Sequence, residues 1–459
     1  MTTPPLASRS RQRIAFIVAT TEGARWAFEQ LRELRDRHGY EVAAVLNGDK
    51  GELVERFRGA GITTHAADFD FTSNVDLLSL PRKVIALTRL LRRERFDVVQ
   101  THLFHSMVIG RIAAWFADVP ARFSMIAGPF HLEAYTPRWI DRSTRWIDTT
   151  TIASCEYTRT LYLRMGVSEQ YLALIYYGPD EAKFDPATVI PAALREEYGW
   201  SADTPLIGMV AYFYPELPHS RWIPPAVQGR AVKSQEDLIR AAPLILREFP
   251  QAKFLLVGSG WEAGGQAYMR RMQELAAELQ LQKSVVFTGF RTDISAVLAA
   301  IDVAVQPSLS ENLGGSIESL LMRCPTVATR VGGLPDSIID GKTGILVEPS
   351  NPASLAEGIL QMLREPERAK QYGCAGRERM LTRFTLRHTA NDLAALYAQA
   401  LHRRSAGYRT PVMCVHMIAG TALCLLIASR YVLFEVLALR LWDRVRSHWE
   451  QMCARLPWG

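Results

Sequence analysis

The sequence is poor in cysteine, and its six cysteines are too scattered to form the close pairs that zinc sites use. They are Cys155, Cys324, Cys374, Cys414, Cys424 and Cys453. The spacing therefore indicates neither a zinc site nor a disulfide framework, and a reduced cytosolic chain is expected. Internal repeats and low-complexity tracts are also missing, and with 48% hydrophobic and 22% charged residues the composition is that of a globular chain of two or three domains.

A large excess of charge of one sign is missing too. The formal net charge is +6 over 459 residues. Spread over this length, that excess is too small to indicate nucleic-acid binding, and no nucleic-acid partner is expected. It remains compatible with anionic ligands or an anionic membrane surface.

Long uncharged apolar runs are rare. Near the N-terminus, "IAFIVA" is shorter than the roughly 7–15 residues of a signal-peptide core, so it predicts a buried strand. Residues 412–429 carry no charge and approach the roughly 20 residues of a membrane span. Tryptophans and arginines that suit a membrane interface follow. We therefore expect residues 409–459 to form a membrane-associated helical tail, with lipid contacts through residues 411–445. A single span and a monotopic helix both stay open, and the alternative is a helix buried against the other domains or a second chain.

Apolar strands alternate with amphipathic helices along the rest of the chain. Strands are expected at "RIAFIVA", "YEVAAVL", "DVVQTH" and "TTTIAS", and the pattern restarts near Leu206 with six more: "PLIGMVAYF", "AKFLLVGSG", "SVVFTGF", "DVAVQPS", "TVATRVGG" and "GILVEPS". Continuous apolar strands separated by helices are typical of parallel sheets covered on both faces. The sequence thus predicts an α/β fold with two doubly wound Rossmann-like domains facing a cleft. The expected bounds are 1–190 for the first domain, 191–385 for the second, and 386–408 for a helix returning toward the first domain.

The stretch "SLSENLGGSIES" at residues 308–319 places two carboxylates around a pair of glycines, directly after an apolar strand. Glu311 is expected in the loop at the strand exit and Glu318 on the first turns of a helix. A carboxylate accepts two hydrogen bonds at once, which suits a vicinal diol such as a ribose, and a helix N-terminus suits an anion. The alternative is that both are ordinary carboxylates complementing the helix dipole.

The longer stretch "PSLSENLGGSIESLLMRCPTVATRVGGLPDSIIDGKTGILVEP" resembles the retaining glycosyltransferases of the GT-B fold, family 4 (glycosyl transferases group 1). Their signature is a strand, then PS…E-G-F-G, a second Glu eight positions after the first, then P-V-V-A and G-G-x-x-E. The resemblance implies that the second domain, 191–385, binds the nucleotide sugar and that the first, 1–190, lies on the acceptor side. It also implies that Glu311 holds the donor sugar and Glu318 the nucleotide ribose. It implies that Gly314 and Gly315 let backbone N–H groups approach the donor, together with Asn312 and Leu313. Here six residues, not seven, separate the glutamates.

The same resemblance implies cations for the donor diphosphate. Lys233 stands where the family has a Lys-Gly pair, with Ser234 in place of the glycine, and Tyr212 stands in the region of the family's arginine. Arg230, or else Arg221, is the expected second cation.

Further donor contacts are expected at Thr288 and Gly289, with Phe290, because "VVFTGF" resembles the strand end that meets the base. Gly23, in "TTEGAR" after the first strand, is expected near the diphosphate or the acceptor. The dipeptide "AG" fills the family's His-Gly position, and His131 lies three residues after it. His131 is expected to hold the donor sugar near the reaction centre, or else to be structural.

Two other patterns predict no function. His102 and His105 have a spacing that suggests a metal, but no carboxylate or cysteine nearby completes a site, so they are expected to be loop or acceptor-side residues. "VGSGWEA" matches the dinucleotide pattern G-x-G-x-x-A, but the next strand does not end in an acidic residue, so a glycine turn is expected.

Together these features predict a glycosyltransferase that moves a sugar from a nucleotide-diphosphate sugar to a glycan or lipid-linked acceptor with retention of configuration. The predicted catalytic residues are Glu311, His131 and Lys233, with no metal and no cofactor. We expect a role in cell-surface polysaccharide or glycolipid synthesis at the cytoplasmic face of the cell membrane. The alternatives are a nucleotide-sugar epimerase and a non-catalytic nucleotide-sugar-binding or scaffold protein of the same fold.

Overall fold

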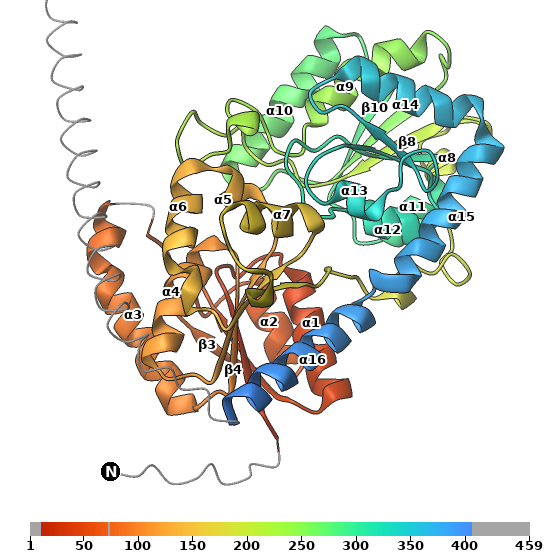
Figure 1. Ribbon diagram of the computed structural model, residues 1–459. Coiled ribbons are helices and arrows are strands. Elements are labelled where there is room, and N and C mark those ends of the chain that lie inside the picture. The colour runs from red at the N-terminus through yellow and green to blue at the C-terminus, as the bar shows by residue number, and fades with distance from the viewer. Residues whose placement is uncertain (1–10, 72–73, 406–459) are drawn as a thin grey trace, which may run out of the picture. The chain divides into compact units, whose positions relative to one another are not determined.

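The computed structural model describes residues 11–71 and 74–405 (Figure 1). The chain divides into two units: residues 1–69 with 83–401, and residues 70–82 with 402–459. The predicted tail, residues 409–459, lies outside the described residues, as do the lipid contacts predicted for 411–445. Within the described ranges, no helix is long and apolar enough to cross a membrane.

The first sheet has seven parallel strands in the order β3-β2-β1-β4-β5-β6-β7. The strands are β1 Arg13–Val18, β2 Glu41–Leu46, β3 Thr63–Ala66, β4 Val98–His102, β5 Ala121–Ile126, β6 Thr150–Ala153 and β7 Leu172–Leu174. The four strands predicted here are confirmed as β1, β2, β4 and β6. Each is almost wholly buried, because a parallel sheet has helices on both faces.

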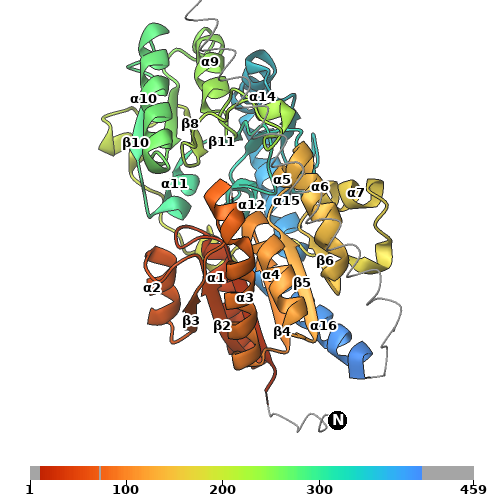
Figure 2. The same ribbon diagram turned by 90° about the vertical axis from the view of Figure 1, so that its left-hand side faces the viewer.

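In the described part of the chain, the helices that alternate with or follow these strands in sequence are α1 Arg25–His38, α2 Glu52–Gly59, α3 Asn74–Glu94, α4 Phe104–Phe116, α5 Phe130–Glu133, α6 Tyr135–Thr144 and α7 Glu156–Arg164. Figure 2 shows α1 and α4 beside the strands. The helix α1 ends at Gly39, which takes a left-handed conformation, with φ 72°, and whose N–H caps the last turn. The helix α16, Leu386–Ser405, lies against this sheet, where Leu393 and Tyr397 join the core formed by β1 and α1.

The second sheet has six parallel strands in the order β10-β9-β8-β11-β12-β13. They are β8 Leu206–Val210, β9 Lys253–Val257, β10 Val285–Gly289, β11 Val303–Gln306, β12 Thr326–Thr329 and β13 Ile345–Val347. All six predicted strands are confirmed. The strand order reverses between β8 and β11, and ligands of such sheets bind beyond the carboxyl ends of the strands at that point.

Helices cover both faces of the second sheet. They are α8 Leu194–Glu197, α9 Gln235–Leu246, α10 Glu262–Glu278, α11 Ile294–Ala300, α12 Ser316–Leu321, α13 Leu334–Ser337, α14 Pro352–Arg364 and α15 Pro366–Arg383. Leu256 of β9 packs with α9, α10 and α14, while its neighbour Leu255 packs on the other face with α11. This alternation is that of a doubly wound fold. We call residues 11–69 and 83–178 the first lobe, and residues 194–383 the second lobe; both belong to the first unit.

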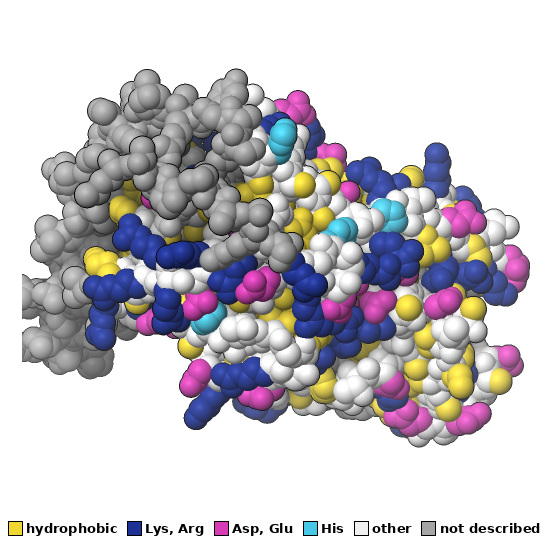
Figure 3. Space-filling model, turned by 90° about the horizontal axis from the view of Figure 1, so that it is seen from below, with side chains coloured by type: hydrophobic (Ala, Val, Ile, Leu, Met, Phe, Trp, Pro, Cys, Tyr) yellow, Lys and Arg dark blue, Asp and Glu magenta, His cyan; other side chains and the backbone are white. Residues whose placement is uncertain are grey.

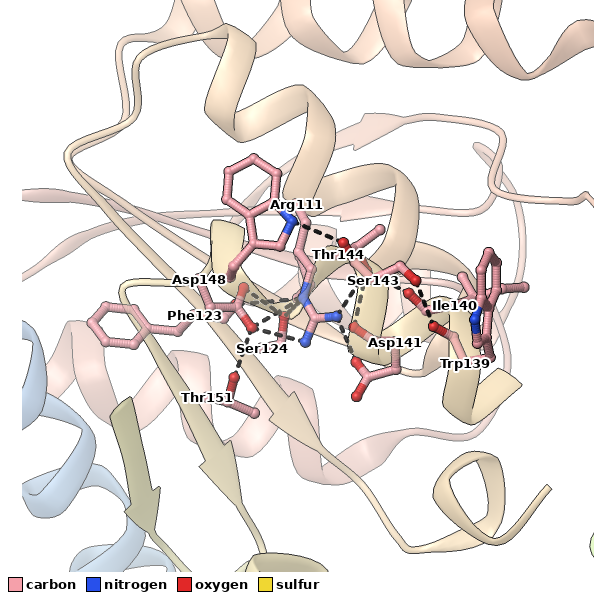
Figure 4. Close-up of polar contacts among 12 residues, drawn as sticks. Arg111, Phe123, Ser124, Trp139, Ile140, Asp141, Ser143, Thr144, Asp148 and Thr151 are labelled. Atoms are coloured by element: carbon pink, nitrogen blue, oxygen red, sulfur yellow. Dashed lines mark hydrogen bonds and ion pairs between the residues drawn. The ribbon is translucent and has the colours of Figure 1, made fainter. Parts of the chain in front are cut away.

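A buried charge network holds α4 and α6 onto the first sheet (Figure 4). The guanidinium of Arg111 donates to Asp148 at 3.0 Å and to Asp141 at 2.5 Å, and also to Ser124 at 2.9 Å. Both ion pairs are fully buried. Burial alone would lower the pKa of Arg111, but the two carboxylates outweigh it and raise that pKa above its ordinary value. At the surface, by contrast, Lys and Arg are interspersed with Asp and Glu over the described part of the face in Figure 3.

Candidate active site

An ion pair joins the loops that follow β8 and β11. Lys233 donates from its Nζ to Oε2 of Glu311, and both side chains are mostly buried. Burial opposes the charge on Lys233, but the Glu311 carboxylate outweighs it and raises the pKa of the lysine. Since β8 and β11 flank the point where the strand order reverses, the pair lies where such a sheet binds its ligand. The structure thus brings these two predicted residues together.

The backbone around Glu311 is fixed by hydrogen bonds and close packing. Ser308 donates to the Glu311 carboxylate at 3.0 Å, and the N–H of Gly333 donates to the Glu311 carbonyl at 3.2 Å. Gly332 has a φ of 53°, and a Cβ on it would overlap that same carbonyl. Gly314 also has a φ of 53°, and its Cβ would meet the Glu311 carboxyl carbon at 3.0 Å. Only glycine suits both positions, which explains why the sequence has glycine at each of them.

Glu318 lies on α12, as predicted, and that helix has six residues. The charges of Glu29 and Arg25, on α1 of the first lobe, act on the Glu318 carboxyl. Burial, and secondarily the Glu29 carboxylate, raise the pKa of Glu318 to about 7, and Arg25 opposes this. Glu29 is itself bound by Arg25 at 3.2 Å and by Lys183 at 2.5 Å. Glu318 is therefore poised between its neutral and charged forms near neutral pH.

An aromatic cluster lines the carboxyl ends of β8, β9 and β10. The ring of Tyr212 lies 5.1 Å from that of Trp261 and is stacked 6.3 Å from that of Phe290, which is 61% exposed. Gly289, predicted to meet the base, has open space where a Cβ would stand. Gly23 of the first lobe abuts Trp261, whose ring would lie 3.4 Å from a Cβ there. The sequence pattern did not single out Trp261; its position directly after the glycine turn was the available signal.

Other predicted donor residues have local roles in the structure. Leu313 is buried in a hydrophobic cluster of the second lobe, so only its backbone can face a donor. Thr288 donates to the carbonyl of Gly289 at 3.0 Å. Gly315 packs against Gln306, whose Nε2 would lie 2.8 Å from a Cβ.

Arg230 and Arg221, the predicted second cations, are engaged away from the Lys233–Glu311 pair. Arg230 donates to Asp237 at 2.6 Å, and also to Ser234 and Ser350. Arg221 lies over the Tyr135 ring of the first lobe, at the rim of a hollow of about 350 Å³. Within the described ranges, Arg230 shows no contact with Glu311. The spacing could not reveal the partner of Arg230, because Asp237, which binds its guanidinium, lies in the first turn of α9.

His131 packs within the first lobe. It lies on α5 with its ring 5.4 Å from that of Phe104, and its Nε2 is buried without a hydrogen-bond partner among the described residues. Burial lowers the pKa of His131 to about 4, so the imidazole is neutral at physiological pH; nearby Asp141 opposes this shift and Arg111 reinforces it. From the same short helix, Glu133 instead reaches the second lobe, where Ser310 donates to it at 2.6 Å. Sequence reasoning missed Glu133.

His102 and His105 do not lie in loops, so that part of the prediction is wrong, while the acceptor-side role stays a prediction. His102 ends β4 and is fully buried, and burial lowers its pKa to about 3. His105 lies in the first turn of α4. The described ranges contain no group of three His, Cys, Asp or Glu side chains that could hold a metal ion. The glycine turn predicted after β9 is present: Gly258, with φ 147°, packs directly on the backbone of Ala211.

Comparison with known proteins decides the family. Residues 227–379 match the model of glycosyl transferases group 1, and residues 22–178 match that of the glycosyl transferase 4-like domain. The chain is 30% identical over 389 residues to the 2-deoxystreptamine glucosyltransferase of Streptomyces kanamyceticus, covering 79% of this chain and 93% of that protein. The chain belongs to the group 1 glycosyltransferases. It is an enzyme that transfers a glycosyl group, which overrules the non-catalytic alternative.

Other relatives and solved structures agree with this family. A GDP-mannose-dependent alpha-(1-6)-phosphatidylinositol monomannoside mannosyltransferase of Mycolicibacterium smegmatis is 29% identical over 54% of this chain and 62% of its own length. A glycosyltransferase from Rickettsia africae superposes with a TM-score of 0.69 at 19% identity, covering 86% of this chain and 99% of that one. Anabaena HepE in complex with UDP gives a TM-score of 0.67 at 19% identity, covering 84% and 100%. The two-lobed architecture of this glycosyltransferase is thus the GT-B fold.

Proposed function

We propose that this glycosyltransferase takes its sugar from a nucleotide-diphosphate sugar bound at the Lys233–Glu311 pair. The observation that carries the proposal is the meeting of a lysine and a carboxylate at the strand-order reversal of the second sheet. Lys233 has three N–H donors and Glu311 takes one of them, so two are available for diphosphate oxygens. The carboxylate would accept hydrogen bonds from sugar hydroxyls. Names of relatives and of solved structures that include GDP-mannose, UDP and UDP-glucose support a nucleotide sugar as donor.

The nucleoside half of the donor would lie toward the aromatic cluster and Glu318. The open space at Gly289 and the exposed face of Phe290 suit a base, and the Glu318 carboxylate suits the ribose diol. His131, whose Nε2 is buried without a hydrogen-bond partner among the described residues, would hold the donor sugar near the reaction centre.

We further propose transfer with retention of configuration. The bond between the anomeric carbon and the diphosphate oxygen breaks, and the acceptor oxygen bonds to the same face of that carbon. The acceptor proton passes to the departing diphosphate. Lys233 stabilises the negative charge that develops on the leaving group, a contribution for which removal of one donor typically costs about 10²–10³ in rate. The acceptor would be a glycan or a lipid-linked hydroxyl, as the lipid acceptor in the name of the mycobacterial relative supports.

The role would be the synthesis of a cell-surface polysaccharide or glycolipid at the cytoplasmic face of the membrane, without a metal ion. The uncharged run at residues 412–429 supports the membrane location. Unchanged turnover in the presence of EDTA would support the metal-free reaction.

The test begins with thermal shifts against a panel of nucleotide sugars, since a ligand that binds only the folded chain raises the midpoint. The donor found is then offered to glycan and lipid-linked acceptors, and the anomeric configuration of the product is read by NMR. Lys233→Met should abolish at least about 99% of transfer, while Lys342→Met, at an exposed lysine, should not. An inverted anomer would overturn the retaining mechanism. An epimer formed from donor alone would instead favour the epimerase.

A further inference from the structure

The loop that carries Glu311 is held from both lobes. Within its own lobe, Ser308 donates to Glu311, and the N–H of Leu309 donates to the Val232 carbonyl at 2.9 Å, which ties the loop to the Lys233 segment. The side chains on either side of Glu311 bind the first lobe: Ser310 donates to Glu133 at 2.6 Å, and Asn312 accepts from Ser154 at 3.0 Å. Residues directly before and after Glu311 are thus fixed by the other lobe.

Glu133 is the one acidic residue in these two hydrogen bonds between the lobes. Ser310 is only 6% exposed, so its hydroxyl needs a protein partner, and Glu133 supplies it. Burial raises the pKa of Glu133, and hydrogen bonds from Ser310 and from Tyr157 of α7 oppose the shift. The Glu133 carboxyl therefore accepts from one hydroxyl of each lobe. Glu133 is the last residue of α5, the helix that follows β5.

We propose that Glu133 is a positioning residue for glycosyl transfer: through Ser310 it sets the loop that holds Glu311 whenever the two lobes meet. This inference rests on the proposed function of Glu311. Glu133 does not itself touch the reacting atoms. It links approach of the first lobe, where the acceptor is expected, to the orientation of the donor carboxylate. The donor can thus bind before closure, and Glu311 takes its final orientation when the cleft excludes water.

The expected effect separates binding from turnover. In the separated lobes, Ser308, Leu309 and Lys233 still hold the loop, so donor affinity should change by less than about threefold in Glu133→Ala. Turnover needs the lobes together, so kcat should fall by about tenfold or more, as expected when a buried hydrogen bond worth a factor of about ten is lost. Glu133→Gln keeps an oxygen that accepts from Ser310 and should recover most of kcat.

Hydrogen–deuterium exchange of the free enzyme tests the same contact without any donor. Backbone amides of residues 308–314 should exchange about tenfold faster in Glu133→Ala and in Ser310→Ala, and near the parent rate in Glu133→Gln. Asp336→Ala is the matched control, because Asp336 accepts the Glu156 N–H at 2.6 Å in another contact between the lobes that does not involve this loop.

Equal loosening of residues 308–314 in Asp336→Ala would overturn the inference, since any lobe contact would then do the same. Exchange at the parent rate in Glu133→Ala would also overturn the inference. A higher KM for the donor with an unchanged kcat in that variant would do the same. Failure of the proposed function gives a different result from failure of this inference. If the proposed function were wrong, no nucleotide sugar would shift the thermal midpoint, but the hydrogen–deuterium exchange result would be unaffected. Donor binding and turnover are measured with UDP-glucose and GDP-mannose, and turnover with the acceptor that gives product in the parent enzyme.

Discussion

Replacement of Glu318 by glutamine should change how the stability of the folded enzyme depends on pH. In the fold, burial and secondarily Glu29 raise the pKa of this carboxyl from 4.5 to about 7. The unfolded chain therefore releases the proton near pH 4.5, and the folded chain keeps it until about pH 7. Between these values the folded state binds more protons, so its stability falls as the pH rises. The contribution is fully present below about pH 4.5 and is lost by the time the pH has passed 7.

The size follows from the shift. One pKa unit corresponds to about 1.4 kcal/mol, so a shift of this size is worth about 3 kcal/mol at full ionisation. About 2–3 kcal/mol of this change falls between pH 5 and pH 8. Glu318→Gln keeps the shape of the side chain and cannot ionise, so it lacks this dependence. The variant should therefore gain about 2–3 kcal/mol on the parent as the pH rises through this range.

Urea unfolding of parent and variant at pH 5, 6, 7 and 8 measures the difference. Glu29→Gln is the control: it removes the repelling carboxylate and leaves Arg25 and Lys183 in place, so the loss of stability should move to lower pH. A difference between parent and Glu318→Gln that stays constant from pH 5 to pH 8 would refute the reasoning. If Glu318 also binds the donor ribose as a carboxylate, donor affinity should rise about tenfold from pH 6 to pH 8 in the parent alone.

Three further substitutions test the packing around the site. Arg111→Met leaves two buried aspartates without their cation and should lower the free energy of unfolding by about 3–5 kcal/mol in urea titrations; an unchanged midpoint would show that the network contributes nothing. Ser234 has a φ of 52°, so Ser234→Gly should be neutral or stabilise by up to about 1 kcal/mol in the same assay, and a clear loss would mean that its hydrogen bond to Arg230 outweighs the strain. Gly332→Ala should lower the thermal midpoint and transfer activity together, because a Cβ there overlaps the Glu311 carbonyl; full activity would contradict this packing.

The sequence by itself determined the two α/β regions, all six strands of the second sheet and the place of Glu311 at the exit of β11. These features are local: a buried parallel strand is a continuous apolar run, and a left-handed glycine such as Gly39 ends a helix wherever it stands. The strands β3, β5 and β7 were not predicted. Of the two edge strands, β3 reads TTHA and has little apolar signal, and β7 reads LAL and is only three residues long. In β5, the polar Ser124 interrupts the apolar run, and its hydroxyl accepts from the buried Arg111.

Only the tertiary structure decided which charges meet. Lys233 and Glu311 are 78 residues apart, and Ser310 and Glu133 are 177 apart, so no local pattern records either contact. Arg230 and His131 fitted the predicted site by spacing, yet Asp237 holds one and the ring of Phe104 packs on the other. Spacing fixes where a residue stands along the backbone, whereas the direction of its side chain depends on the partners that packing brings within reach, and these come from distant parts of the chain.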